Sequence, residues 1–180
     1  MIISPYPIDL YEKVILLPVY GCSAESIMKS VIAKWYGDCA AVDVVPYCGP
    51  HMYWFRDHMT TLGMDGYEFR ILSRHPVLRW MYAYTTLSNF PRDHEEFLRI
   101  TKDAEYGYTI PISDLLQRFD YSGVNLTCVD VDRLGHSDIC GMRPAIDYVQ
   151  RIDITQRIVD AIEDRYAADM LLGNYKPFQL

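Results

Sequence analysis

The segment LPVYGCSAES, residues 17–26, joins residue types that can hold an anion. Gly21 permits a sharp turn, and Ser23 can cap the helix that follows. Backbone N–H groups at such a helix start, together with the helix dipole, bind an anion without many basic side chains. Tyr20, Gly21, Cys22 and Ser23 are therefore candidate phosphate-binding residues. A plain strand-to-helix turn is the alternative, because the segment lacks the Gly-x-x-x-x-Gly-Lys-Ser/Thr pattern of a Walker A loop.

A second segment of this kind is SRHPVLRWMYAY, residues 73–84. Arg74 stands where a β-rich run ends, and Pro76 suits the first turn of a helix. A guanidinium at such a position can make bidentate contacts to phosphate, and Arg79 follows one turn into the helix. The alternative is that both arginines pair with acidic residues on a solvated surface.

Alternating strands and helices are expected to position these two turns. Apolar and β-branched runs predict strands at residues 13–19, 40–47 and 67–73. Helices are predicted after the first and the third of these strands, from apolar residues at helical spacing. These residues are Ile27, Val31, Ile32 and Trp35 in one helix, and Trp80, Met81, Tyr84 and Leu87 in the other. The pattern predicts a three-layer α/β domain with a central, mainly parallel sheet flanked by helices and a ligand site at the carboxyl ends of its strands.

The middle of the chain is less regular. Pro91 is expected to open a helix that carries Phe97 and Leu98, whereas residues 104–150 have weak periodicity and several turn signals. The topology of that region is not assigned. Because no repeat, low-complexity tract or linker interrupts the sequence, residues 1–180 are expected to form a single domain.

One further helix is predicted near the C-terminus. Asp153 or Thr155 can cap it, and Gly173 ends it. Its shared apolar face consists of Ile158, Ile162, Tyr166 and Met170.

The two turns and the C-terminal helix together resemble the nucleotide-dependent sulfotransferases, especially their carbohydrate-modifying and small microbial branches. LPVYGCSAESI is similar to the family's 5′-phosphosulfate loop, usually Pro-Lys-x-Gly-x-Thr-Ser. SRHPVLRWMYAY is similar to its 3′-phosphate motif, Arg-Asp-Pro-x-x-Arg-x-x-Ser-Ala-Tyr, and RIVDAIEDRYAADMLLGNY to its closing helix. The order and spacing of the three segments agree with the family, and the middle of the chain is left unaligned.

The resemblance implies a shortened, P-loop-like sulfotransferase fold. It also implies 3′-phosphoadenosine 5′-phosphosulfate (PAPS) as co-substrate and transfer of its sulfuryl group to a hydroxyl of a carbohydrate or similar acceptor. On this basis the loop residues 20–23 bind the 5′ side of the nucleotide, and Arg74 and Arg79 bind its 3′-phosphate.

The loop departs from the family at its cation. The family's lysine, which contacts the transferring sulfuryl group, is replaced by Val19. Loss of such an electrostatic contact is expected to slow transfer by orders of magnitude unless another cation takes its place. The other lysines nearby in sequence are Lys13, Lys29 and Lys34, and each lies well away from the loop.

The sequence also differs from the family motifs at other positions, and some of these changes are more conservative than others. Ser23 keeps the hydroxyl of the family's threonine, and Ala24 replaces a serine. Tyr82 replaces the serine that helps to bind the 3′-phosphate, with a bulkier group that aims its hydroxyl elsewhere. His75 replaces the motif's aspartate and is expected to support the turn. The chain is also shorter than most relatives, in the middle region where acceptor-binding segments usually lie.

His51, in CGPHMYWF, is the candidate catalytic base. The family often supplies a histidine or glutamate from the segment after its second strand to take the proton of the acceptor hydroxyl. His58 is a second choice, and a surface or packing role is the alternative for either histidine. The aromatic residues of the cluster Tyr47, Tyr53, Trp54 and Phe55 can stack on a sugar or adenine, or serve as core or partner-binding residues.

Two Cys/His pairs have spacings that suit zinc, namely Cys48 with His51 and His136 with Cys140. No zinc-ribbon pattern surrounds them, so free thiols and ordinary histidines are preferred and no metal is assigned. The sequence has 5 cysteines and no Cys-x-x-Cys, which suits a reducing compartment.

Composition sets the outer limits on function. The 180 residues include 17 Lys and Arg against 24 Asp and Glu, a net charge of −7, which disfavours nonspecific binding to nucleic acid or anionic membrane. No apolar run approaches the length of a membrane span, and no signal peptide is recognised. A cytoplasmic location is expected, or a virion-associated one if the protein serves in an assembly.

Two functions follow from these observations. The first is an active PAPS-dependent sulfotransferase acting on a hydroxyl-bearing acceptor. The second is a protein that keeps the fold without the reaction and serves as a structural or interaction component of a larger assembly, for example a virus particle. Val19, Tyr82 and the short middle favour the second, while Arg74, Arg79 and His51 favour the first.

Overall fold

The computed structural model describes eleven stretches of the chain. They are residues 8–9, 13–17, 19–24, 26–27, 29–30, 66, 68–87, 93–103, 109–118, 125–134 and 146–180. The strand predicted at 40–47 lies outside the described residues, and so does most of the helix predicted to contain Val31, Ile32 and Trp35. Residues 24, 26, 27, 29 and 30 are helical, and Ile27 is buried, as expected for the start of that helix.

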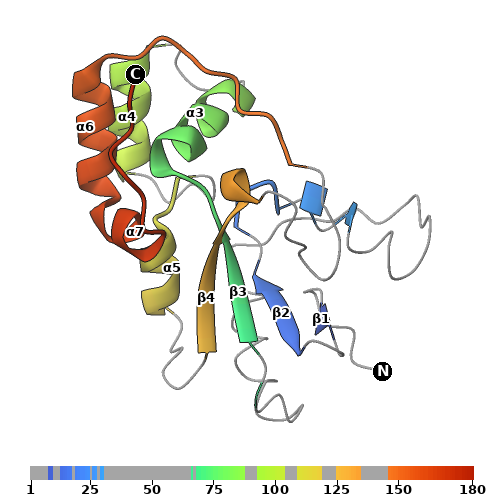
Figure 1. Ribbon diagram of the computed structural model, residues 1–180. Coiled ribbons are helices and arrows are strands. Elements are labelled where there is room, and N and C mark those ends of the chain that lie inside the picture. Colours follow the sequence, from blue (N-terminus) through green and yellow to red (C-terminus); the bar gives the residue numbers. More distant parts are fainter. Residues whose placement is uncertain are drawn as a thin grey trace.

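The described residues include a four-stranded sheet (Figure 1). β1 (Ile8–Asp9) pairs antiparallel with β2 (Val14–Leu17), which runs parallel to β3 (Glu68–Ser73), and β3 runs parallel to β4 (Asn125–Asp130). The sequence therefore predicted β2 and β3 correctly, whereas β4 falls in the region left unassigned. The α/β class, with a small set of parallel strands flanked by helices, is confirmed.

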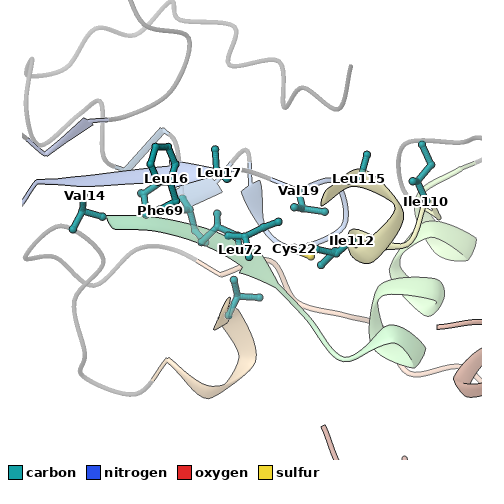
Figure 2. Packing of buried hydrophobic residues seen from close by; sticks show 13 residues of the cluster. Val14, Leu16, Leu17, Val19, Cys22, Phe69, Leu72, Ile110, Ile112 and Leu115 are labelled. Atoms are coloured by element: carbon teal, nitrogen blue, oxygen red, sulfur yellow. The ribbon is translucent and has the colours of Figure 1, made fainter. Parts of the chain in front are cut away.

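Burial along β3 explains why its sequence reads as an apolar run. Successive side chains of a strand point to opposite faces of the sheet, and the neighbouring residues Ile71 and Leu72 are both buried. Both faces of β3 are therefore covered, as is usual for parallel strands. Side chains of β2 and β3 and of the first turn pack with α5 (Ile112–Arg118) in one apolar cluster (Figure 2).

Three helices form a second apolar cluster: α3 (Pro76–Thr86), α4 (His94–Asp103) and α6 (Gln156–Arg165). On α3 the predicted stripe is confirmed, since Trp80 and Met81 are buried and Tyr84 and Leu87 pack against the cluster. Phe97 of α4 is fully buried against Trp80. These helices gather beyond the carboxyl ends of β3 and β4 (Figure 1).

The start of α4 shows a cap that the sequence analysis did not assign. The Asp93 carboxylate accepts a hydrogen bond of 2.8 Å from the Glu96 amide, so an acidic side chain caps the helix. Pro91, which was expected to open this helix, lies outside the described residues.

The C-terminal helix was predicted as one element but consists of two. Thr155 caps α6, as expected, and the chain turns at Tyr166 before α7 (Ala167–Leu172), with Gly173 as its C-cap. The Tyr166 hydroxyl donates to the carbonyl of Thr109, which fixes the turn against the segment before α5. A continuous helix was the wrong prediction because periodicity does not record this tertiary contact. None of the helices described is long and apolar enough to cross a membrane.

Candidate anion-binding turns

Three connections meet at the carboxyl edge of the parallel sheet. The loop 19–24 follows β2, Arg74 follows β3, and the 3₁₀ turn η1 (Val131–Arg133) follows β4. The ends of adjacent parallel strands lie at one edge, so side chains from all three connections can meet there. The two turns singled out in the sequence are indeed in contact.

Arg74 is the centre of this contact. Its side chain is fully buried, and its Nε–H donates to the Asp132 carboxylate at 2.9 and 3.1 Å. One Nη donates to the Gly21 carbonyl at 3.0 Å, and the other to Ser23 Oγ at 3.0 Å and to the Asp147 carbonyl at 2.9 Å. Each of the three nitrogens of the guanidinium thus donates at least one hydrogen bond to a protein oxygen.

Ser23 and Gly21 present oxygen atoms to this guanidinium. Ser23 Oγ accepts from Arg74 and also from the Asp147 amide at 2.8 Å, which accounts for both of its lone pairs. Both residues have a left-handed backbone, with φ of 77° at Gly21 and 53° at Ser23. The first turn therefore presents oxygen acceptors to the Arg74 guanidinium.

Gly21 is required by this geometry for two reasons. A left-handed φ disfavours any residue with a Cβ, and a Cβ at Gly21 would lie 2.9 Å from Cγ of the buried Arg79. We expect Gly21→Ala to lower the free energy of unfolding by about 2 kcal/mol. Gly66→Ala is a matched control, because Gly66 also has a positive φ of 86° but its Cβ would meet nothing within 4 Å. Urea unfolding should show the larger loss for Gly21→Ala, and equal losses would contradict the close approach to Arg79.

Arg79 ties the first turn to the C-terminal helices. Its Nε–H donates to the Tyr20 carbonyl at 2.9 Å, and its Nη1 lies 3.9 Å from the buried Asp169 carboxylate. Asp169 in turn accepts from the amides of Ile112 and Ser113, each at 2.8 Å, at the start of α5. Like Arg74, this arginine is buried and contacts protein groups.

Val19 occupies the position at which the resemblance places a lysine. Its side chain is 2% exposed and belongs to the same apolar cluster as Cys22 and Ile112. Figure 2 shows these three side chains next to one another. The position therefore faces the interior between the loop and α5.

Tyr82 lies beside the same arginine. The Arg74 guanidinium carbon is 5.9 Å from the centroid of the Tyr82 ring, within the range of a cation–π contact. Tyr82 thus adds another protein contact to Arg74.

His75 supports the turn, as the sequence analysis expected. Its Nδ1 accepts a hydrogen bond of 3.2 Å from the Val77 amide and so caps α3. With Nδ1 as acceptor, Nε2 carries the proton and donates to the carbonyl of Lys176 at 2.9 Å. Both ring nitrogens therefore have structural partners.

Burial sets the electrostatics around the ends of β3 and β4. Desolvation raises the pKa of the Cys128 thiol and of the Asp130 carboxyl above their usual values. It raises the pKa of the Tyr175 phenol far above its ordinary range, and the Tyr175 hydroxyl lies 2.7 Å from Ser73 Oγ. These groups consequently favour their uncharged forms more than in water.

The remaining sequence predictions lie outside the described residues. They concern the candidate base His51, the second choice His58, the aromatic residues 47 and 53–55, and the pairs Cys48/His51 and His136/Cys140. Among the described residues, no group of three or more His, Cys, Asp or Glu side chains is arranged to hold a metal ion.

The sequence patterns did not indicate the acidic residues that contact the two arginines. Asp132 and Asp147 hold Arg74, and Asp169 lies beside Arg79. A weak signal was present for Asp132, because the run LTCVDVD, residues 126–132, has the alternation and β-branched residues of a strand that ends in carboxylates.

Comparison of the chain with protein families, with curated proteins and with solved structures found no match.

Proposed function

We propose that this protein is a sulfotransferase-like component that does not transfer sulfuryl groups and instead serves a structural or interaction role in a larger assembly, for example a virus particle. The observation that carries the proposal is the buried Arg74 guanidinium, which holds Gly21, Ser23, Asp132 and Asp147 together. The residues that would bind a nucleotide are bound to one another.

A nucleotide phosphate would have to compete with these contacts. Moving the Arg74 guanidinium onto a 3′-phosphate removes the donor to the buried Gly21 carbonyl and one of the two donors to Ser23 Oγ, and a buried acceptor left without a partner costs about 1–3 kcal/mol. It also separates the guanidinium from Asp132. A brace between two turns is therefore the more stable use of this arginine.

The replacement of the loop lysine supports the same proposal. Sulfuryl transfer needs positive charge near the sulfuryl group that is transferred. Removing one such electrostatic contact typically lowers the rate of the reaction by about 100- to 1,000-fold. Val19 supplies no charge, and its burial beside Ile112 leaves the position inside the core.

Calorimetry with 3′-phosphoadenosine 5′-phosphate tests the proposal. This nucleotide carries both phosphates that the two turns would hold. We expect no heat of binding up to millimolar concentration at pH 7, which corresponds to a free energy of binding weaker than about −4 kcal/mol. Saturable binding at micromolar concentration would contradict the proposed role.

A second candidate function is PAPS-dependent sulfuryl transfer, and one observation favours it. The two turns follow the neighbouring parallel strands β2 and β3 at one edge of the sheet, and ligands of such sheets bind at the carboxyl ends of the strands. In this case labelled sulfuryl transfer from PAPS to a carbohydrate should be measurable and should fall on His51→Ala. No transfer to a panel of hydroxyl acceptors would leave the structural role.

A further inference from the structure

A short C-terminal segment folds back over the end of β3. We call residues Gly173–Phe178 the C-terminal strap. It leaves α7 through a turn in which the Tyr175 amide donates to the Met170 carbonyl at 2.9 Å and Asn174 has a φ of 48°. The residues from 175 onward belong to no helix or strand, so their position depends on individual contacts.

The strap contacts the residues on both sides of Arg74. The Tyr175 hydroxyl lies 2.7 Å from Ser73 Oγ, and the Lys176 carbonyl accepts from His75 Nε2 at 2.9 Å. Ser73 is the last residue of β3, and His75 is the cap of α3. The backbone that carries the guanidinium is therefore held before and after Arg74 by the same six-residue segment.

Ring contacts and one carboxylate complete the attachment. The His75 ring has its centroid 5.2 Å from that of Tyr175 and 5.3 Å from that of Phe178. The Phe178 amide donates to the Glu163 carboxylate of α6 at 2.6 Å, and the Arg133 guanidinium lies 5.3 Å from the Tyr175 ring centroid. The strap thus contacts α6, η1 and the Arg74 turn between β3 and α3.

We propose that the C-terminal strap is a latch that keeps the Arg74 turn closed and that its release frees the guanidinium from Gly21 and Ser23. The inference rests on the proposed function in taking the closed turn as the resting state, and it adds the element that controls that state. Residues 175–178 belong to no helix or strand and are held on the turn by individual contacts, so the strap can detach while the sheet remains intact. Any partner that captures the segment 175–178 would then open the turn without itself contacting Arg74.

The test measures by NMR how fast the Arg74 Nε–H exchanges with solvent, and compares variants of the chain of residues 1–180 with the wild type. Two strap variants are used. Tyr175→Ala with Phe178→Ala removes both rings, and Gly173→Ala places a Cβ 2.0 Å from the Tyr175 ring and so displaces it. The control is Leu171→Ala with Leu180→Ala, which removes two exposed apolar side chains, 84% and 62% accessible, at the same end of the chain. The backbone amide of Ile71, inside the sheet, reports global opening.

We expect exchange of the Arg74 Nε–H to rise about tenfold or more in both strap variants, with the Ile71 amide unchanged and the control like the wild type. Unchanged exchange at Arg74 would overturn the latch. An equal rise at Ile71 would overturn it as well, because the strap would then be part of the cooperative core. Nucleotide binding by the wild type is a separate measurement, so failure of the proposed function is distinguishable from failure of the latch.

Discussion

Replacing Arg74 with methionine is expected to lower the free energy of unfolding by about 3–5 kcal/mol. Methionine keeps a long, unbranched side chain but donates no hydrogen bonds. The substitution removes the guanidinium that pairs with the Asp132 carboxylate, the donor to the buried Gly21 carbonyl and one of the two donors to the Ser23 hydroxyl. Urea unfolding, followed by tryptophan fluorescence, measures the loss.

Arg70→Met is the matched control for this prediction. Arg70 lies on β3, the strand that precedes Arg74, and also pairs with a carboxylate, that of Glu68 at 3.0 Å, but the two side chains are 26% and 27% exposed. A partly exposed pair of this kind contributes less than about 1 kcal/mol. Similar losses for the two variants would contradict the view that Arg74 braces the turns.

Lysine at position 19 is expected to destabilise the protein rather than to create a working loop. We expect the free energy of unfolding of Val19→Lys to be about 3 kcal/mol lower than that of Val19→Met at pH 7. Both side chains overfill the site, but only lysine adds a charge. Position 19 is buried among apolar residues, so the ammonium has no water around it. Denaturant unfolding of the two variants gives the difference directly.

The pH dependence identifies the cause of this difference. Burial lowers the pKa of a lysine in the native state below the value of about 10.4 in the unfolded chain. Between these two values the unfolded state binds more protons, so the stability of Val19→Lys relative to Val19→Met should rise with pH and the gap should close near pH 10. A small difference in stability between the two variants that does not vary with pH would mean that the ammonium reaches solvent at the sheet edge, as the sulfotransferase hypothesis requires.

Local patterns in the sequence predicted the elements that carry the two turns. Strands β2 and β3 and the stripe of α3 follow from runs and spacings that lie within about a dozen residues, and the structure places them as expected. The adjacency of the turns at one sheet edge follows from parallel pairing, which alternation of strands and helices predicts. His75 as a support of the turn was also predictable, because it precedes a proline at a helix start.

The roles of Arg74 and Val19 depend on partners that are distant in sequence. The carbonyl of Asp147 and the carboxylate of Asp132 are 73 and 58 residues away from Arg74, and no local pattern links them. An arginine after a strand suits phosphate and carboxylate equally, since both match the guanidinium fork. The break at Tyr166 and the C-terminal strap were missed for the same reason, because tertiary contacts decide them.

The role of Arg74 as an internal brace is tested most directly by the ¹H–¹⁵N spectrum of the arginine side chains, recorded on the wild-type chain with and without millimolar 3′-phosphoadenosine 5′-phosphate. We expect a slowly exchanging Nε–H signal for Arg74, because this group is buried against Asp132, and no change when the nucleotide is added. Rapid exchange of that signal with water, or a saturable shift on addition of nucleotide, would contradict the claim that Arg74 serves as an internal brace.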